Sequence, residues 1–398
     1  MGLVSGAVLV LNCGSSSIKH QLLDPLEGTR LASGILERIG EAGSVAVHTS
    51  GGRTERDVRP LATHEDALAA IVEAYEAHGT GLTAAGVVAV GHRVVMGGRE
   101  FAGPARIDDH VMEAIEALSP LAPLHNSANL AGIRVARRLL PDVPHVAVFD
   151  TAFFHDLPDV AATYAIDRGM AETHGIRRYG FHGTSHRYVS EQVASILDRP
   201  GDDLRQVVLH LGNGASASAV LGGRPIDTSM GMTPLEGLVM GTRSGDLDPA
   251  VVVHLLRRGL TVDEVDDLLN RRSGMLGLAG DNDLREVHRR ADAGDAAAEQ
   301  ALAIYVHRLR KYVGAYAALL GGLDALTFTA GVGEHDPVVR ARTCDGLGFL
   351  GITADPVRNA ARGGGARVIS PDGSPVAVLV VPTDEELAIA RDTISSLG

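Results

Sequence analysis

The sequence predicts an α/β fold made of two related domains, and three observations lead to this prediction. The chain has 398 residues, which is enough for two domains of ordinary size, each with its own core. Short apolar runs alternate with segments of helical periodicity, a pattern that favours layers of sheet and helix. Two strand–turn–strand segments about 200 residues apart also resemble each other.

The repeated segment is an apolar run, a turn of small polar residues, and a second run. The first copy has its strands at residues 7–11 and 18–23, and the second has them at 207–211 and 217–221. Glycine, serine and asparagine fill the turns, as is typical of hairpins. A duplicated unit that opens each half of the chain explains this likeness. Two unrelated hairpins in a large protein remain the alternative at this stage.

The remaining elements follow from periodicity. The polar, Gly-rich residues 40–60 predict an exposed hairpin, and residues 66–77 and 110–118 carry apolar side chains on one helical face. Residues 296–320 form a long Ala/Leu-rich helix. Further strands are expected at 146–149, 325–329 and 376–381.

Composition excludes several classes of protein. An apolar content of 45% argues against disorder, and no window is apolar enough to span a membrane. A formal net charge of −13 disfavours binding to nucleic acid or anionic membranes. The two cysteines cannot form a disulfide framework, and no basic residue precedes the first apolar run as in a signal peptide. We therefore expect a cytoplasmic protein.

Lysine usage excludes one mode of phosphate binding. The chain has only Lys19 and Lys311, and neither follows a glycine. The P-loop pattern GxxxxGK[ST] therefore occurs nowhere in the chain. The two Gly/Ser/Asn turns offer another way to hold phosphate, because backbone N–H groups in such turns can point together at an anion. Plain hairpin turns are the simpler interpretation of each turn alone.

Other candidate groups lie beside glycines or after strands. Residues 91–98, 177–186 and 240–249 place histidine and arginine in Gly-rich segments, where a planar guanidinium can bind a carboxylate or a phosphoryl group. Asp150 and Glu385 follow predicted strands, where ligands bind in open α/β sheets. The alternatives are surface arginines, structural histidines and helix N-caps, and Thr383 or Asp384 suits an N-cap better than Glu385 does.

Residues 12–19, 177–186, 210–216 and 240–249 together resemble the acetokinase family, and the resemblance extends over essentially the whole chain. It implies two duplicated ribonuclease-H-like (actin-like ATPase) domains with an active-site cleft between them. The domains would be residues 1–150 with 385–398, and residues 151–384, the second binding nucleotide and forming a homodimer. The implied reaction is reversible transfer of the ATP γ-phosphoryl group to acetate, giving ADP and acetyl phosphate, with Mg²⁺ or alternatively Mn²⁺.

The resemblance also implies roles for individual residues. Asp150, His182 and Arg243 would be catalytic, with Asp150 orienting the metal or its waters rather than acting as a base. Arg93 would bind substrate, and Val95, Leu124, Phe181 and Pro234 would surround the acetate methyl group. Asn12 and Glu385 would hold the metal. The nucleotide contacts would be Lys19, His210, Leu211, Gly212, Asn213, Gly214, Asp283, Leu284, Arg285, and a loop of Gly331, Val332, Gly333, Glu334 and His335.

His20 departs from the family pattern, in which this position is commonly aromatic. Two rival functions stay open: a propionate or butyrate kinase of the same family, against which Val95 argues by its size, and a non-enzymatic nucleotide switch like actin or Hsp70. We expect small-molecule substrates as the only ligands besides a second copy of the chain. The homodimer is expected because helix 296–320 carries more leucine and tyrosine than one layer easily covers.

Overall fold

The computed structural model describes residues 6–41, 43–77, 86–122 and 125–398. The chain forms two compact units, the first comprising Met1–His155 with Asp384–Gly398 and the second comprising Asp156–Thr383. Each unit contains one mixed β-sheet with helices packed on it. In the part of the chain that the structure describes, no helix is long and apolar enough to cross a membrane.

The sheet of the first unit has the strand order β5-β4-β3-β2-β1-β6-β8-β7. Strands β1 to β5 form an antiparallel meander, whereas β6 and β8 run parallel to β1. The strands are β1 (Ala7–Cys13), β2 (Ser17–Asp24), β3 (Thr29–Glu37), β4 (Ser44–Ser50), β5 (Arg53–Arg59), β6 (Val87–Val94), β7 (Ala105–Arg106) and β8 (His145–Phe149).

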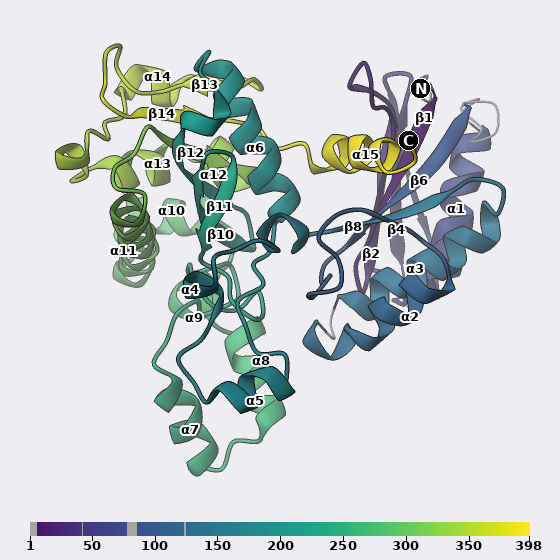
Figure 1. The fold of residues 1–398 in the computed structure, drawn as a ribbon, viewed down its shortest axis with the longest axis horizontal. Helices are drawn as coiled ribbons and strands as arrows, with labels where there is room; N and C mark the ends of the chain where they lie inside the picture. The colour runs from purple at the N-terminus through teal and green to yellow at the C-terminus, as the bar shows by residue number, and fades with distance from the viewer. Residues whose placement is uncertain (1–5, 42, 78–85, 123–124) are drawn as a thin grey trace. The chain divides into compact units, whose positions relative to one another are not determined.

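Helices cover both faces of this sheet (Figure 1). Helices α1 and α3 pack together over one face, and α15 contacts β1, β6 and β8 on the other. The elements are α1 (His64–Ala77), α2 (Asp109–Ala117), α3 (Asn126–Leu139) and α15 (Glu385–Ser395), with short 3₁₀ turns η1 (Ser119–Leu121) and η2 (Ala152–Phe154).

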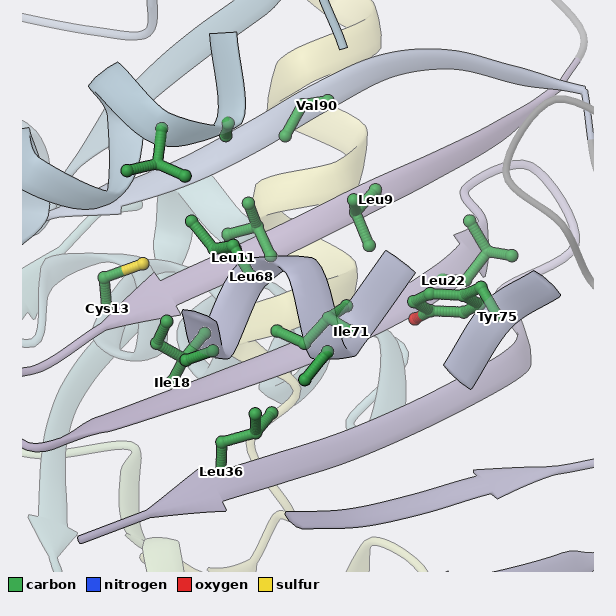
Figure 2. Packing of buried hydrophobic residues seen from close by; sticks show 14 of the residues in the cluster. Leu9, Leu11, Cys13, Ile18, Leu22, Leu36, Leu68, Ile71, Tyr75 and Val90 are labelled. Atoms are coloured by element: carbon green, nitrogen blue, oxygen red, sulfur yellow. The ribbon is translucent and has the colours of Figure 1, made fainter. Parts of the chain in front are cut away.

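Successive side chains of β1 point to opposite faces of the sheet, and they divide the core around this strand into two layers. Leu9 and Leu11 pack with Ile71 of α1, as Figure 2 shows, while Val8 and Val10 pack with Ile389 of α15. All of these side chains are buried. Since each large aliphatic side chain stabilises the fold by about 1.5–3 kcal/mol when buried, the two layers fix β1 at the centre of the sheet.

The sheet of the second unit has the order β11-β10-β9-β12-β14-β13. Strand β9 is antiparallel to β10 and parallel to β12, just as β1 is antiparallel to β2 and parallel to β6. The strands are β9 (Arg205–Leu211), β10 (Ala215–Leu221), β11 (Arg224–Thr228), β12 (Ala325–Thr329), β13 (Arg367–Val368) and β14 (Ala377–Val380). The shared order confirms that the two hairpins open related domains.

Helix α6 packs on the sheet of the second unit through Val189 and Val193, and Figure 1 shows α11 on the other side of that sheet. The helices and 3₁₀ turns are α4 (Asp159–Ala162), α5 (Arg168–Thr173), α6 (Gly183–Ile196), η3 (Gly201–Asp203), α7 (Pro249–Arg257), α8 (Val262–Arg271), α9 (Gly274–Ala279), α10 (Leu284–Asp292), α11 (Ala296–Leu319), α12 (Ala330–His335), α13 (Pro337–Cys344), η4 (Gly348–Leu350) and α14 (Pro356–Ala360).

The long helix α11 forms as predicted, but it does not expose the surplus of leucine and tyrosine from which a dimer was expected. Leu302, Tyr305, Leu309 and Tyr316 are all buried inside the second unit itself. Helices α9, α10 and α13 and the sheet cover them, so the helix has no large surplus of apolar surface. Leu319 at its end is 58% exposed. The homodimer stays a prediction without this support.

Candidate functional site

The first unit brings four of the predicted residues into one cluster, which we call the Arg93 cluster: Asn12, Arg93, Asp150 and Glu385. Asn12 lies near the end of β1, Arg93 near the end of β6, and Asp150 directly after β8. These strands are parallel neighbours, so their carboxyl ends meet at the same edge of the sheet. Glu385 is the first residue of α15.

The Arg93 guanidinium is the centre of this cluster. Its Nε and Nη2 donate to the two carboxylate oxygens of Asp150 at 2.9 and 2.6 Å, a bidentate pair. Its Nη1 donates to Asn12 Oδ1 at 3.4 Å, and Glu385 Oε2 lies 3.7 Å from Nε. The Asp150 side chain is 1% exposed. This pairing fixes the direction in which the guanidinium points.

Electrostatics in the Arg93 cluster follow from burial and charge. Burial lowers the pKa of Arg93, but the carboxylates of Asp150 and Glu385 outweigh this effect, so the net shift is upward and Arg93 stays a cation. Burial raises the pKa of Glu385, and Arg93 opposes that rise. Asp384 supplies the N-cap of α15 by accepting from the Leu387 N–H, which leaves the Glu385 carboxylate for other contacts.

Two more predicted residues lie next to this cluster. Lys19 on β2 is exposed and lies directly opposite Asn12 across the β1–β2 hairpin. Val95 follows β6, is buried, and donates its N–H to Asn129 Oδ1 at 3.1 Å. Leu124, also predicted for the acyl pocket, lies outside the described residues.

The second unit places His182 in an unusual backbone conformation. Its φ of +58° puts it in the left-handed region at the N-terminus of α6, a conformation that costs a non-glycine residue energy and is often found at functional sites. The imidazole stacks on His210 with ring centroids 4.2 Å apart. Its Nδ1 is hydrogen-bonded to Ser216 Oγ at 2.9 Å.

His182 and Arg243 meet at the turn between β9 and β10. A methyl group on Gly214 would lie 3.6 Å from both His182 Nε2 and Arg243 Nη1. The glycine therefore brings the imidazole and the guanidinium close to the backbone of the turn. Burial lowers the pKa of Arg243, and among the described residues no ion pair joins this arginine to a carboxylate. We call this group the Gly214 cluster.

Two residues predicted for the acyl pocket lie close to the Gly214 cluster, one as a neighbour in sequence and the other through a hydrogen bond. Phe181 is buried and directly precedes His182. The Pro234 carbonyl accepts from Arg243 Nη1 at 3.4 Å. Val95 belongs to the first unit, so the pocket for the acetate methyl group stays a prediction.

A cavity of about 830 Å³ lies in the second unit. This volume suits a nucleotide-sized ligand. Several predicted nucleotide contacts line it, namely Gly212, Asn213, Asp283, Leu284, Arg285, Gly331, Val332 and His335. The other predicted contacts in this unit, His210, Leu211, Gly214, Gly333 and Glu334, do not line it.

The predicted loop at residues 331–335 is wrong, because this segment is helix α12. Ala330, with φ of +64°, makes the sharp turn from β12 into the helix. A Cβ on Gly331 would meet no atom within 4 Å, whereas one on Gly333 would lie 3.2 Å from the Phe328 backbone. Gly333 thus permits close packing of helix on strand, and Gly331 leaves the cavity open.

Several other residues line the cavity that were not among the predicted nucleotide contacts: Gly241, Met275, Asn282, His288, Tyr305, Asp336, Pro337 and Val338. His288 Nε2 lies 2.7 Å from Asp336 Oδ2. Asp336 also caps α13 by accepting from the Val338 and Val339 N–H groups. Asp336 at the N-cap and Pro337 as the first residue of α13 form a helix-start signal that could have located Asp336. Nothing local in the sequence indicates that His288 is its partner.

Comparison with known proteins decides the family. The model of the acetokinase family matches residues 7–391. The chain belongs to the acetokinase family. It is 59% identical over 393 residues to the acetate kinase of Leifsonia xyli subsp. xyli, an alignment that covers 98% of this chain and 99% of the relative.

Two solved structures with similar folds extend this result to the whole architecture. Acetate kinase from Porphyromonas gingivalis gives a TM-score of 0.93 at 44% identity, covering 99% of this chain and all of that one. A propionate kinase from Francisella tularensis gives the same TM-score at 40% identity, covering 98% and 99%. The fold is thus the actin-like ATPase type of this family, as predicted. Since both enzymes match equally well in fold, the fold does not separate the two substrates.

Proposed function

We propose that this chain transfers the γ-phosphoryl group of ATP to acetate, giving ADP and acetyl phosphate, and that it catalyses the reverse reaction. The Gly214 cluster carries this proposal. His182 and Arg243 converge on the backbone of a Gly-rich turn, and this turn also borders the large cavity through Gly212 and Asn213. An arginine at such a point that is paired with no carboxylate of the described residues is suited to an anion whose charge grows during a reaction.

The cavity of the second unit would hold the nucleoside part of ATP. Its walls combine apolar side chains such as Leu284 and Val332 with the polar groups of Asn282 and His288. The backbone N–H groups of Asn213 and Gly214 would face the phosphates, since Gly-rich turns bind phosphate through such groups. The Gly212 N–H instead donates to the Gly214 carbonyl at 3.0 Å and closes the turn. Lys19, from the first unit, would add a positive charge.

Phosphoryl transfer requires alignment and positive charge more than covalent chemistry by the protein. Arg93 would bind the acetate carboxylate, and Arg243 and His182 would donate to the oxygens of the transferred group. Because the carboxylate of acetate is itself the nucleophile, no base is needed. The bidentate bond to Arg93 supports a role for Asp150 in orienting that guanidinium.

The side-chain oxygens of the Arg93 cluster are suitable ligands for a magnesium ion. Asn12 Oδ1 and the Asp150 and Glu385 carboxylates all lie within 4 Å of one guanidinium. Mg²⁺ in nucleotide sites usually takes one or two carboxylates and fills its other positions with phosphate and water. Asn12 and Glu385 would hold the ion, and Mn²⁺ is an alternative; the ion would supply positive charge beside the phosphates.

A test must separate this reaction from its rivals. Hydroxylamine converts an acyl phosphate to a hydroxamate with release of phosphate, and added ferric iron makes the hydroxamate visible as a coloured complex. ATP, Mg²⁺ and acetate should therefore give hydroxamate only when all three are present. A nucleotide switch would give none with any carboxylate. A propionate or butyrate kinase would give more product with the longer acid at equal concentration. Absence of hydroxamate from wild-type protein with ATP and acetate would refute the proposal.

A further inference from the structure

A series of hydrogen bonds leads from His182 through three buried side chains into the sheet of the second unit. His182 Nδ1 is 2.9 Å from Ser216 Oγ, and the same oxygen is 2.7 Å from His186 Nε2. His186 Nδ1 is in turn 2.8 Å from Ser218 Oγ. Ser216 and Ser218 are alternate residues of β10 and both are fully buried, as is His186 on α6.

Proton counting limits the direction of these hydrogen bonds. A hydroxyl group has one proton to donate, and a neutral imidazole has one N–H and one acceptor nitrogen. Burial, together with the neighbouring His210, lowers the pKa of His186 well below its usual value, so this ring is neutral. In the part of the chain that the structure describes, Ser218 Oγ has no hydrogen-bond partner other than His186 Nδ1.

Ser218 therefore determines the donor and the acceptor in each hydrogen bond of this series. If His186 Nδ1 carried the proton, the Ser218 hydroxyl would accept from it and its own buried O–H would have no acceptor, which is costly. Ser218 must donate to Nδ1, and the His186 proton then lies on Nε2 and is donated to Ser216. The Ser216 hydroxyl, already accepting from His186, donates its own proton to His182 Nδ1.

We propose that Ser218, acting through His186 and Ser216, holds neutral His182 in the tautomer whose proton lies on Nε2. Ser216 and Ser218 are thus positioning residues. This inference rests on the proposed function for its catalytic consequence. Nε2 is the atom that lies beside Gly214 and Arg243, so the hydrogen-bond chain presents an N–H donor where the transferred phosphoryl group is expected. The opposite tautomer would present a lone pair to the phosphoryl oxygens and repel them.

The tautomer can be measured without reference to activity. In protein labelled with ¹⁵N-histidine, long-range ¹H–¹⁵N spectra distinguish a protonated ring nitrogen from a bare one, and His182→Gln identifies the signals of this residue. We expect a protonated Nε2 and a bare Nδ1 in the wild type. Ser218→Ala removes the donor that sets the direction, and should give a mixture of both tautomers of His182, although residue 218 does not touch this ring.

A matched control and a second variant complete the experiment. Ser190→Ala removes another buried hydroxyl, on α6, which donates to the Arg187 carbonyl of the same helix, and should leave the His182 signals unchanged. Ser216→Ala removes the hydrogen bond to His182 Nδ1, and should also allow His182 to adopt both tautomers. In Ser218→Ala the kcat should fall about twofold, the factor that an even mixture of the two tautomers gives, with the KM for ATP unchanged.

Two outcomes would overturn the inference: a wild-type His182 protonated on Nδ1 alone, or signals that stay the same in both Ser218→Ala and Ser216→Ala. Failure of the proposed function would look different. In that case wild-type protein would show the expected tautomer and its release by the variants, yet would form no acetyl phosphate from ATP and acetate.

Discussion

Replacing His20 tests how the burial of one imidazole in the first unit makes the stability of the fold depend on pH. His20 on β2 is buried, its Nδ1 lies 3.0 Å from the Tyr75 hydroxyl, and its ring stacks on His48. Gly34 makes room for it, because a Cβ there would lie 2.3 Å from His20 Nε2. Burial, followed by the charge of His48, lowers the pKa of His20 to about 3.

The unfolded chain, with an ordinary histidine pKa near 6.5, therefore binds a proton that the folded chain does not bind between about pH 6.5 and pH 3. Stability falls as the pH falls through this range. Between pH 6.5 and 4.5, His20 alone should remove about 2 kcal/mol from the free energy of unfolding. In His20→Phe, which cannot take up a proton, the acid-induced loss should be smaller by that amount. Losing the Tyr75 hydrogen bond shifts stability similarly at both pH values.

Urea unfolding curves followed by circular dichroism at both pH values give these free energies. His110 lies exposed on α2, and His110→Gln is the matched control. This variant should lose as much stability on acidification as the wild type. If His20→Phe also lost as much as the wild type, His20 would not be the buried neutral imidazole that its surroundings indicate.

Further expectations concern ligands and assembly. Val95→Ala should narrow the preference for acetate over propionate in kcat/KM, chiefly by lowering the KM for propionate, and an unchanged ratio would remove Val95 from the acyl pocket. Gly331→Val should raise the KM for ATP about tenfold or more by filling the cavity, whereas Gly314→Val, on α11 and outside the cavity lining, should leave it unchanged. Light scattering at micromolar concentration should give the mass of a homodimer, and the mass of one chain would contradict this.

Much of the fold could be predicted because its signals are local. The hairpins β1–β2 and β9–β10 follow from apolar runs around Gly/Ser/Asn turns, and α1, α2 and α11 follow from helical periodicity. Helix α12 was missed because glycines at positions 331 and 333 indicate a loop locally, whereas close packing on Phe328 requires one of them. Periodicity also could not tell that the second unit itself covers the apolar face of α11.

The site was predictable only in part, since its geometry depends on residues far apart in sequence. The resemblance to a family selected Arg93 and Asp150, but their bidentate pair joins positions 57 residues apart and depends on the neighbouring strands β6 and β8. Ser216 and Ser218 are ordinary small residues of a strand in the sequence. They become part of the site only because β10 lies against His186 of α6.

The kinetics of Arg243→Ala show whether the Gly214 cluster stabilises charge on the transferred phosphoryl group. At saturating ATP and acetate, the variant should lose about 10²-fold or more in kcat, measured as acetyl phosphate formed, while the KM for ATP changes less than about threefold. Arg257→Ala, on α7 and exposed, should behave as the wild type. A variant that keeps the wild-type kcat and loses only affinity for ATP would show that Arg243 does not stabilise this charge.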